Sequence, residues 1–237
     1  MNERVAVYSG TREVYPQMYT AVKSLILNTP MDRVYLFIED DEFPYVLPKN
    51  CIPMNVSGQE FFLPGSANTM NRWGYMDLLR CCLATMLPDE HRVIFFDIDT
   101  IVDADISELF DIDMNGYFFA GVPEVAKSNL FFRYIKTGVT VHKLDLLRIW
   151  RKEDEMITFL NIFRFEYAGQ DMINLLGQGR IKTLDSEFNS NMCTMPCHRT
   201  KIIHYAALKP EQYKRDWHYR KYEQVDIADV MEKEDEE

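Results

Sequence analysis

The sequence predicts an α/β fold in which helices cover a mostly parallel, partly mixed β-sheet. Short apolar runs alternate with segments whose apolar residues recur at helical spacing, which is typical of strand–helix–strand units. The chain has 237 residues, of which 47% are hydrophobic, so it can bury one large core. The most apolar run leads into two aspartates, which indicates ligand binding beyond the carboxyl ends of the strands.

The first half of the chain accounts for the parallel part of this sheet. We expect helices over 16–27 and 74–86, because apolar residues recur there at helical spacing. The expected strands are 5–8, 34–38, a weaker one at 51–56, and the acid-bearing run 92–102. Side chains alternate along a strand, so Asp97 and Asp99 are expected to share one face.

The second half is expected to add strands of mixed direction. The expected elements are a short helix at 107–110, strands at 117–122 and 138–141, and helices at 144–150 and 171–176. We find no internal repeat and no low-complexity linker, so residues 1–225 are expected to form one domain. The acidic segment 226–237 is expected to be disordered.

Composition excludes several classes of function. The formal charge of −11 argues against nonspecific binding to nucleic acid. The sequence has no stretch of about 18 apolar residues and no apolar leader, so we expect a cytoplasmic protein. Its five cysteines are an odd number and are expected to be reduced. Cys193 and Cys197 are four residues apart, but nothing completes a four-ligand zinc site.

The pair Asp97-x-Asp99 is the candidate metal site. Two anions on one face call for a counter-ion, and Mn²⁺ or Mg²⁺ takes oxygen ligands and can also hold a diphosphate. A solvated strand end is the alternative explanation. A phosphatase motif is disfavoured because Ile101 occupies a position that requires Thr or Val. A calcium loop from Asp111 is disfavoured because its twelfth position is Val122, where a bidentate Glu is needed.

Later segments give this weak motif a context. They are Thr137-Gly138-Val139, Gly169-Gln170-Asp171-Met172-Ile173-Asn174, Phe188-Asn189, and the run from Ile202 through His204 to Lys209-Pro210. Together with Asp97-x-Asp99, they make the chain resemble glycosyltransferase family 8 from Val5 to Pro210. That family includes bacterial lipopolysaccharide galactosyltransferases and glycogenin.

The resemblance implies a GT-A fold whose Rossmann-like N-terminal half binds a nucleotide. It also implies a retaining transfer of a sugar from a UDP-sugar donor to an acceptor, with Mn²⁺ as cofactor or Mg²⁺ in its place. The metal ligands would be Asp97, Asp99 and His204. Negative charge grows on the departing diphosphate, so a preorganised cation there would lower the barrier.

The resemblance also assigns residues around the donor. Arg80 matches the helix arginine that reaches the donor, Lys209 matches the lysine that neutralises the diphosphate, and Gln170, followed by Asp171, faces the anomeric carbon. An amide is a poor nucleophile, so a polarising or positioning role is expected for Gln170. The remaining donor contacts would be Tyr8, Ser9, Thr11, Tyr15, Ile98, Lys136, Thr137 and Gly138.

Four departures from the family pattern affect this site. Gly169 stands where the family usually has Asp, Lys136 where it often has Asn, and Ala207 where it usually has Gly; the interval from His204 to Lys209 is one residue short. The first two make the pocket more positive. They leave two alternatives for the donor, a hexuronic acid paired with Lys136 or an ordinary hexose with Lys136 facing solvent or diphosphate.

Two other functions stay open beside sugar transfer. The same departures are compatible with a sugar-nucleotide-binding protein that has lost transfer. A nucleotidyltransferase with a similar sheet would release pyrophosphate instead of UDP, and it would leave Gln170 and His204 unexplained. The acceptor stays open among a sugar, a lipid-linked glycan, a protein and a small molecule, because acceptor pockets are built from variable loops.

The segment 213–222 mixes four cations with four aromatic residues in an otherwise acidic chain. Trp, Tyr, Lys and Arg are the residues that favour an anionic membrane interface, so a peripheral contact is one interpretation. The other is a surface helix that covers the sheet edge or closes over the acceptor. The acidic segment after Asp226 opposes membrane approach and favours the second interpretation.

Overall fold

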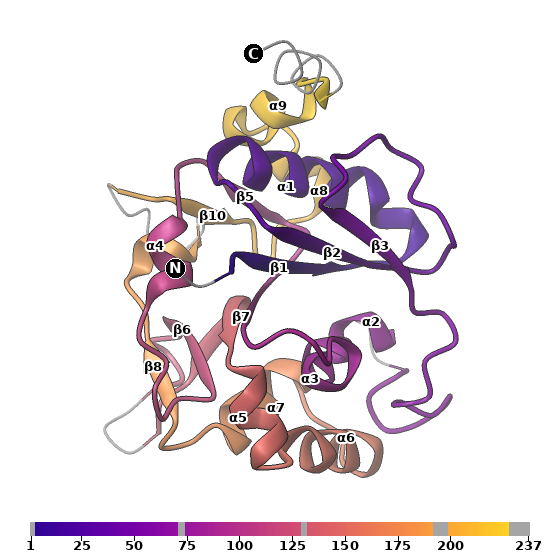
Figure 1. Cartoon of the computed structure of the whole chain (residues 1–237), viewed down its shortest axis with the longest axis vertical. Coiled ribbons are helices and arrows are strands. Elements are labelled where there is room, and N and C mark those ends of the chain that lie inside the picture. The colour runs from indigo at the N-terminus through magenta and orange to yellow at the C-terminus, as the bar shows by residue number, and fades with distance from the viewer. Residues whose placement is uncertain (1–2, 71–73, 129–131, 192–198, 228–237) are drawn as a thin grey trace.

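The protein, described here from a computed structural model, is built on a central mixed β-sheet (Figure 1). The structure describes residues 3–70, 74–128, 132–191 and 199–227. Within these residues the central sheet has seven strands in the order β3-β2-β1-β4-β7-β6-β8. Their bounds are β1 Val5–Ser9, β2 Arg33–Ile38, β3 Cys51–Asn55, β4 Val93–Phe96, β6 Phe119–Pro123, β7 Ile135–His142 and β8 Ile181–Thr183.

Most of these strands are parallel, and β7 reverses direction between β4 and β6. The predicted α/β fold with a mostly parallel, mixed sheet is therefore confirmed. The strands β3-β2-β1-β4 are the parallel half expected from the first part of the chain. Because β1 and β4 are parallel neighbours, the residues that follow them lie at the same edge of the sheet.

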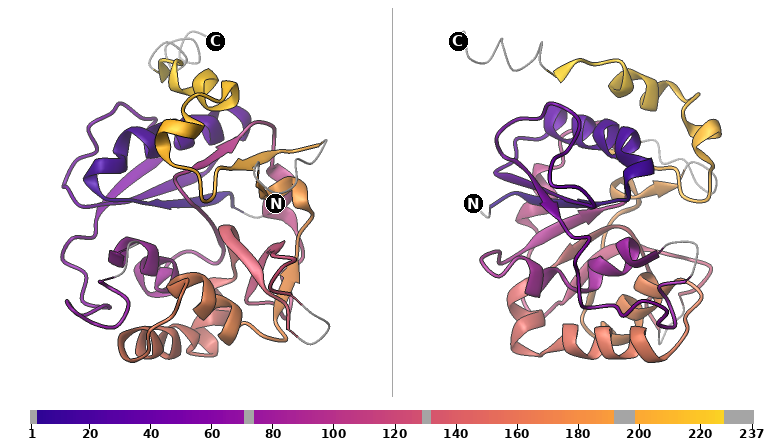
Figure 2. Two further views of the ribbon diagram at one scale, coloured as in Figure 1. Left: turned by 180° about the vertical axis from the view of Figure 1, so that it is seen from behind. Right: turned by 90° about the vertical axis from the view of Figure 1, so that its right-hand side faces the viewer.

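Helices cover both faces of this sheet (Figure 2). One face packs against α1 (Tyr15–Asn28) and α4 (Ser107–Asp111). The other packs against α2 (Gly74–Leu78), α3 (Leu83–Met86), α5 (Leu144–Ile149), α6 (Lys152–Ile162) and α7 (Ala168–Leu176). Strand alternation divides β1 between the two layers, since Val5 and Val7 join one core cluster while Ala6 and Tyr8 join the other.

The acid-bearing run is not one strand, which corrects the prediction for 92–102. It forms β4 in the central sheet and β5 (Thr100–Val102) in a second sheet, with Asp97, Ile98 and Asp99 as the link. The backbone N–H and the hydroxyl of Thr100 both donate to the carbonyl of Asp97, at 3.2 and 2.6 Å, and close a turn. The two acids are therefore brought together by a turn instead of by strand alternation.

The second sheet has three strands in the described part of the chain, in the order β5-β10-β9. Here β10 is Ile202–His204 and β9 is Ser190–Asn191. These strands are two or three residues long, which is too short for a period-2 pattern to reveal. Helix α6 was also not predicted, because its apolar residues do not form one clear stripe. The predicted helix over 74–86 is interrupted by a 3₁₀ turn, Leu79–Cys81.

The C-terminal helix α9 (Trp217–Glu223) lies over α1, and the short helix α8 (Pro210–Tyr213) precedes it (Figures 1 and 2). The buried ammonium of Lys23 on α1 donates to the carbonyls of Glu223 and Val225, at 3.1 and 2.7 Å, and ties the end of α9 to α1. The tyrosines of the segment 213–222 are buried in a cluster with Tyr205, while Trp217 is 62% exposed. A peripheral membrane contact would thus rest on Trp217 and the cations alone.

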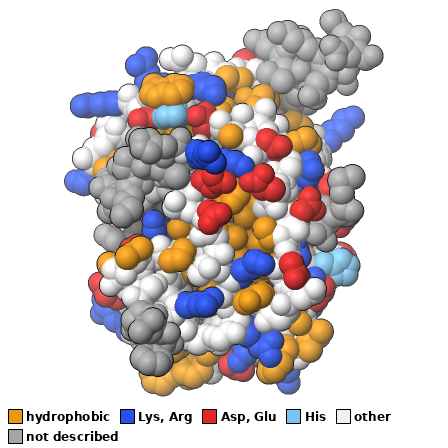
Figure 3. Space-filling view, turned by 90° about the vertical axis from the view of Figure 1, so that its left-hand side faces the viewer, with side chains coloured by type: hydrophobic (Ala, Val, Ile, Leu, Met, Phe, Trp, Pro, Cys, Tyr) orange, Lys and Arg blue, Asp and Glu red, His pale blue; other side chains and the backbone are white. Residues whose placement is uncertain are grey.

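The surface, the cysteines and the C-terminal segment bear on the remaining predictions. On the face shown in Figure 3, acidic side chains lie among basic ones, so that face has no continuous basic stripe. Within the residues described, none of the helices has both the length and the apolar character needed to cross a membrane. Cys51, Cys81 and Cys82 are buried free thiols. Cys193, Cys197 and most of the acidic segment, from 228 onward, lie outside the described residues.

Ala207 adopts a left-handed backbone conformation, with φ of 67°. It belongs to the turn after β10 in which the N–H of Leu208 donates to the carbonyl of Tyr205 at 2.9 Å. Glycine adopts this conformation without the steric cost that a Cβ brings. This geometry gives a physical reason for a glycine at this position.

We expect Ala207→Gly to raise the free energy of unfolding by about 0.5–1 kcal/mol, because the relief of strain exceeds the entropy that glycine adds to the unfolded chain. Urea unfolding of the two proteins measures the change. Ala206→Gly is the control, since Ala206 has no positive φ, and it should lower stability. A loss of stability in Ala207→Gly as large as in the control would contradict the strain argument.

Candidate active site

Two aspartates and one histidine meet beyond the carboxyl end of β4. Nε2 of His204 lies 3.2 Å from Oδ1 of Asp99 and 3.6 Å from Oδ2 of Asp97. His204 is the last residue of β10, and it pairs with Thr100 directly after the acids. The backbone N–H of Tyr205 also donates to the carbonyl of Asp99, at 2.9 Å. The short second sheet therefore brings together the residues that the family resemblance named as metal ligands.

This donor set fits a divalent cation. One ligand atom from each of the three residues lies within 4.8 Å of the others. Neighbouring ligands of an octahedral ion with bonds of 2.0–2.1 Å lie about 2.9 Å apart, so a small closure of the triad would complete the geometry. Carboxylates suit Mn²⁺ and Mg²⁺, while an imidazole ligand favours Mn²⁺ over Mg²⁺.

Electrostatics at the triad also favours a cation. Burial raises the pKa of Asp97, although Arg80 opposes this effect. Burial would likewise raise the pKa of Asp99, but the charge and hydrogen bond of His204 outweigh it and the pKa is lowered. Burial disfavours a charged His204, yet Asp99 and Asp97 raise its pKa above the usual value. The shifts of Asp99 and His204 reflect the attraction between the carboxylates and the imidazolium, whereas the shift of Asp97 reflects its burial.

Two neighbours fix the position of the His204 ring. Oδ1 of the fully buried Asn189 lies 2.8 Å from Nδ1 of His204. On another side, Gly138 of β7 leaves the space that the ring fills, because a Cβ on Gly138 would lie 2.0 Å from Cε1 of His204. The carbonyl of Gly138 accepts from the N–H of Asp97, at 2.8 Å. Gly138 thus contacts two members of the triad, since it leaves room for the ring of His204 and its carbonyl binds the backbone of Asp97.

Arg80 lies behind Asp97 and is 4% exposed. Its Nη2 donates to Oδ1 of Asp97 at 2.7 Å and to Oδ1 of Asp77 at 2.6 Å. Its Nη1 donates to the carbonyl of Thr137 at 3.0 Å, and its guanidinium lies 4.6 Å from the ring centre of Phe95. Arg80 therefore orients one acid of the triad, and its predicted direct contact with a donor stays a prediction.

Gln170 is held by residues on both sides of its amide. Its Oε1 accepts from the backbone N–H of Thr137 at 3.1 Å and from the hydroxyl of Thr137 at 3.3 Å. Its Nε2 donates to the hydroxyl of Tyr134 at 3.2 Å, and that hydroxyl donates to Asp171. Thr137 also accepts from Arg80, so a hydrogen-bonded chain connects Asp97 with Gln170 and Asp171. Tyr134 was not among the predicted site residues.

Gly169, next to Gln170, packs closely against Asp77 and Arg80. A Cβ at this position would lie 3.1 Å from the carbonyl oxygen of Asp77 and 3.2 Å from both Cδ of Arg80 and Oδ2 of Asp77. The close approach of α2 and the following 3₁₀ turn to α7 therefore disfavours an aspartate there. Asp77 places a carboxylate beside Gly169 instead. No sequence signal had pointed to Asp77.

The two candidate lysines differ in their surroundings. Lys136 is half-buried on β7 and shares a strand face with Gly138, so it faces the side of the triad. It has no hydrogen bond or ion pair with other side chains in the described ranges. Lys209 is exposed and precedes α8. Its predicted contact with diphosphate stays untested, since no described interaction joins it to the triad.

The ends of β1 and β4 and the residues that follow them hold three of the predicted donor contacts. Ser9 lies at the carboxyl edge, where its hydroxyl donates to the carbonyl of Met76 at 3.1 Å. Ile98 lies near Gly10, because a Cβ on Gly10 would be 3.7 Å from Cγ2 of Ile98. Thr11 is half-buried just before the turn that leads into α1. These three residues are placed where a ligand beyond β1 and β4 would pass.

Tyr8 lies in the core. It is 0% exposed and stacks on Phe96 with ring centres 5.3 Å apart. Strand alternation turns its side chain toward the core under α1, so its predicted contact with a donor stays a prediction that this burial does not support.

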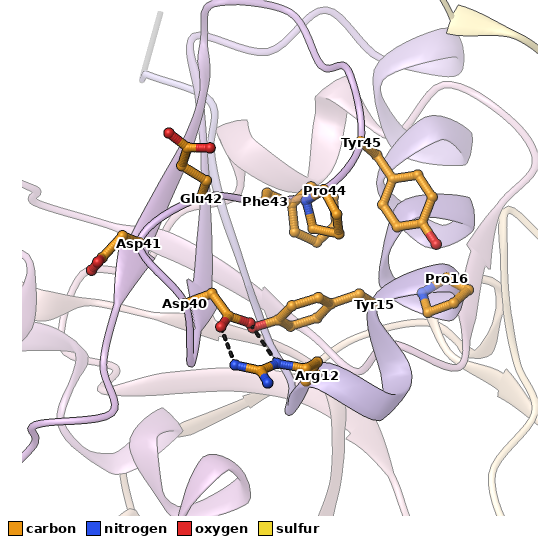
Figure 4. A pocket seen from close by; sticks show the side chains of 9 residues that line it. All are labelled: Arg12, Tyr15, Pro16, Asp40, Asp41, Glu42, Phe43, Pro44 and Tyr45. Carbon is orange, nitrogen blue, oxygen red and sulfur yellow. Dashed lines mark hydrogen bonds and ion pairs between the residues drawn. The ribbon is translucent and has the colours of Figure 1, made fainter.

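Tyr15 lines a pocket of about 760 Å³ whose lining residues do not include the triad (Figure 4). The hydroxyl of Tyr15 donates to Asp40 at 3.1 Å and accepts from the N–H of Glu39 at 2.8 Å. Asp40 also pairs with Arg12. The lining residues are Arg12, Tyr15, Pro16, Asp40, Asp41, Glu42, Phe43, Pro44 and Tyr45. Tyr15 is 2% exposed, and its predicted donor contact stays a prediction.

Comparison with known proteins agrees with this architecture. GlyB of Streptococcus pneumoniae serotype 4, a glycosyltransferase, is 24% identical over 205 residues, which are 80% of this chain and 48% of GlyB. A putative glycosyltransferase of Haemophilus influenzae is 22% identical over 210 residues, or 77% of this chain and 62% of that protein. The chain thus spans between about half and two thirds of the length of these relatives.

Solved structures show the same fold. GlyE of S. pneumoniae TIGR4 superposes with a TM-score of 0.75 at 15% identity, over 98% of this chain and 63% of GlyE. The galactosyltransferase LgtC, solved with donor and acceptor sugar analogues, gives a TM-score of 0.68 at 17% identity, over 92% of this chain and 93% of LgtC. These neighbours are GT-A glycosyltransferases, so the predicted GT-A fold is confirmed.

The model of the family described as "Glycosyl transferase family 8" matches residues 7–219. That match includes the triad, Arg80, Gln170 and the segment after His204. By this match, which confirms the resemblance inferred from the motifs, the chain belongs to glycosyltransferase family 8.

Proposed function

We propose that the protein is a retaining glycosyltransferase that moves a hexosyl group from a UDP-sugar to an acceptor, with Mn²⁺ assisting the departure of UDP. The observation that carries this proposal is the meeting of Asp97, Asp99 and His204 in a chain of this family. The structural neighbour LgtC is a galactosyltransferase that was solved with donor and acceptor sugar analogues, which supports a sugar donor here.

The residues of the chain divide the work of this reaction. Asp97, Asp99 and His204 would hold the cation, and Arg80 fixes the carboxylate of Asp97. Bound there, a divalent cation supplies positive charge to the diphosphate oxygen from which the sugar departs. The amide of Gln170 is oriented before any substrate binds. Because its Oε1 already accepts two hydrogen bonds from Thr137, its free capacity is one N–H, which suits positioning better than nucleophilic attack.

A donor panel tests the proposal. Purified protein is mixed with UDP-glucose, UDP-galactose or UDP-glucuronate, with Mn²⁺ or with EDTA, and UDP release is measured. We expect release from one donor class that Mn²⁺ supports and EDTA removes. Binding of a UDP-sugar without turnover of any donor would favour the sugar-nucleotide-binding protein, and release of pyrophosphate would favour a nucleotidyltransferase.

Lys136, which has no side-chain partner in the described ranges, makes a hexuronosyl donor the second candidate. For a hexose donor, Lys136 would contact the diphosphate, and we expect Lys136→Asn to raise KM for the preferred donor about 10-fold, the effect of losing one charge-assisted hydrogen bond. The ranking of the three donors should be kept. A loss confined to UDP-glucuronate would instead assign Lys136 to a sugar carboxylate. Lys49→Asn, a change on the exposed loop before β3, is the control.

A further inference from the structure

We propose that Asn189 is a positioning residue that holds His204 in the tautomer able to ligate the cation, an inference that rests on the proposed metal-assisted function. Asn189 follows the 3₁₀ turn Ser186–Phe188 and immediately precedes β9, which pairs with β10 beside His204. It is 0% exposed, so its side chain does not serve the surface. Its partner is the imidazole itself.

The chemistry of this contact decides which ring nitrogen carries the proton. A carbonyl oxygen can only accept a hydrogen bond, so Oδ1 of Asn189, 2.8 Å from Nδ1, requires a proton on Nδ1. The neutral ring then has its lone pair on Nε2. That atom faces both acids, at 3.2 Å from Asp99 and 3.6 Å from Asp97. The tautomer that Asn189 selects is therefore the one that a cation between these groups needs.

The opposite orientation of the amide would select the other tautomer. If Nδ2 of Asn189 faced the ring, it would donate to Nδ1 and place the proton on Nε2, where it would occupy the ligand position. Nδ2 is buried without a partner among the described residues, so no other group there competes for the amide. The ring of His204 packs into the space that a side chain on residue 138 would otherwise fill, so Gly138 limits its position. Asn189 and Gly138 thus fix the rotation and the protonation of one ligand together.

Two substitutions separate this role from a merely structural one. Asn189→Leu keeps a similar volume and removes the acceptor. Asn189→Asp keeps an acceptor and cannot donate when ionised, so it enforces the same tautomer. We expect Asn189→Leu to weaken Mn²⁺ binding about 10- to 100-fold, as loss of such hydrogen-bond partners does in other metal sites, and Asn189→Asp to bind at least as tightly as the original protein.

Binding is measured with Mn²⁺ alone, from the electron paramagnetic resonance signal of the free ion, on the full chain. Thermal unfolding in EDTA reports whether each variant is folded. A second readout is the nitrogen NMR shift of the His204 ring with Mg²⁺, which should show a proton on Nδ1 in the original protein and in Asn189→Asp. That signal is assigned by its loss in His204→Gln.

Equal Mn²⁺ affinity in the original protein and folded Asn189→Leu would overturn the proposal, as would weaker binding in Asn189→Asp than in Asn189→Leu. If Asn189→Leu does not fold, a ring proton on Nε2 instead of Nδ1 in the original protein with Mg²⁺ would overturn it by itself. None of these results would contradict sugar-nucleotide turnover in the donor panel. Failure of the original protein to bind Mn²⁺ at all would remove both this inference and the metal part of the proposed function.

Discussion

We expect Asp99→Asn to lower Mn²⁺-supported UDP release at least about 100-fold. Losses of this size follow when one preorganised electrostatic group is removed from a reacting centre. Asp99 contributes one of two negative charges at the triad, and an amide oxygen is a weaker ligand for a hard cation. Its described side-chain partner is His204, so the fold should tolerate the change. Initial rates across a Mn²⁺ titration measure the effect, because weaker metal binding shifts the Mn²⁺ requirement upward.

Asp97→Asn should lower turnover to a similar extent and should also reduce stability. Asp97 pairs with the buried Arg80, which would keep Asp77 as its remaining carboxylate. We expect a loss of about 1–3 kcal/mol in the free energy of unfolding, because a buried charge loses one partner. Asp89→Asn, on the exposed turn before β4, is the matched control and should change neither property. Unchanged UDP release in folded Asp99→Asn would refute the role of the triad.

The sequence predicted most strands of the central sheet because they carry strong local signals, whereas the three-residue strand β8 was not predicted. Apolar runs such as 93–96 and the helical spacing over 16–27 arise from burial on the sheet and helix faces, and both correspond to elements of the structure. The second sheet escaped prediction, since strands of two or three residues are set by pairing between distant segments. That pairing is what carries His204 to the acids.

The sequence predicted the candidate metal ligands, but it did not predict how the residues around them hold them in place. Asp97, Asp99 and His204 are residue types with a direct chemical meaning, and family resemblance supplied their grouping. Tyr134 was not predicted, because its role depends on hydrogen bonds of its hydroxyl with Gln170 and Asp171, which no sequence pattern marks. Asn189 belonged to a motif of the resemblance, but its contact with His204 appeared only in the structure. For Tyr8, the family resemblance predicted a contact with the donor, and the burial of its side chain under α1 does not support that prediction.

Gly138→Ala is expected to damage the site as severely as the loss of a ligand. The added Cβ would lie 2.0, 2.5 and 2.8 Å from Cε1, Nδ1 and Nε2 of His204. Gly138 lies on β7 between two paired strands, and its carbonyl accepts from Asp97, so the backbone has little freedom to retreat. The ring must therefore move away from the acids and from Asn189. We expect Mn²⁺-supported turnover to fall about 100-fold, as for a misplaced catalytic group.

A double-mutant cycle identifies the cause of this loss. If the added methyl acts only by displacing the imidazole, Gly138→Ala should have no further effect in a His204→Ala background, where the space is free. Additive losses in turnover would show instead that Gly138 is required for close approach of the donor itself. Gly58→Ala is the control, because a Cβ there meets no atom within 4 Å, and it should leave turnover unchanged. The cycle thus distinguishes a glycine that makes room for a metal ligand from one that makes room for a sugar nucleotide.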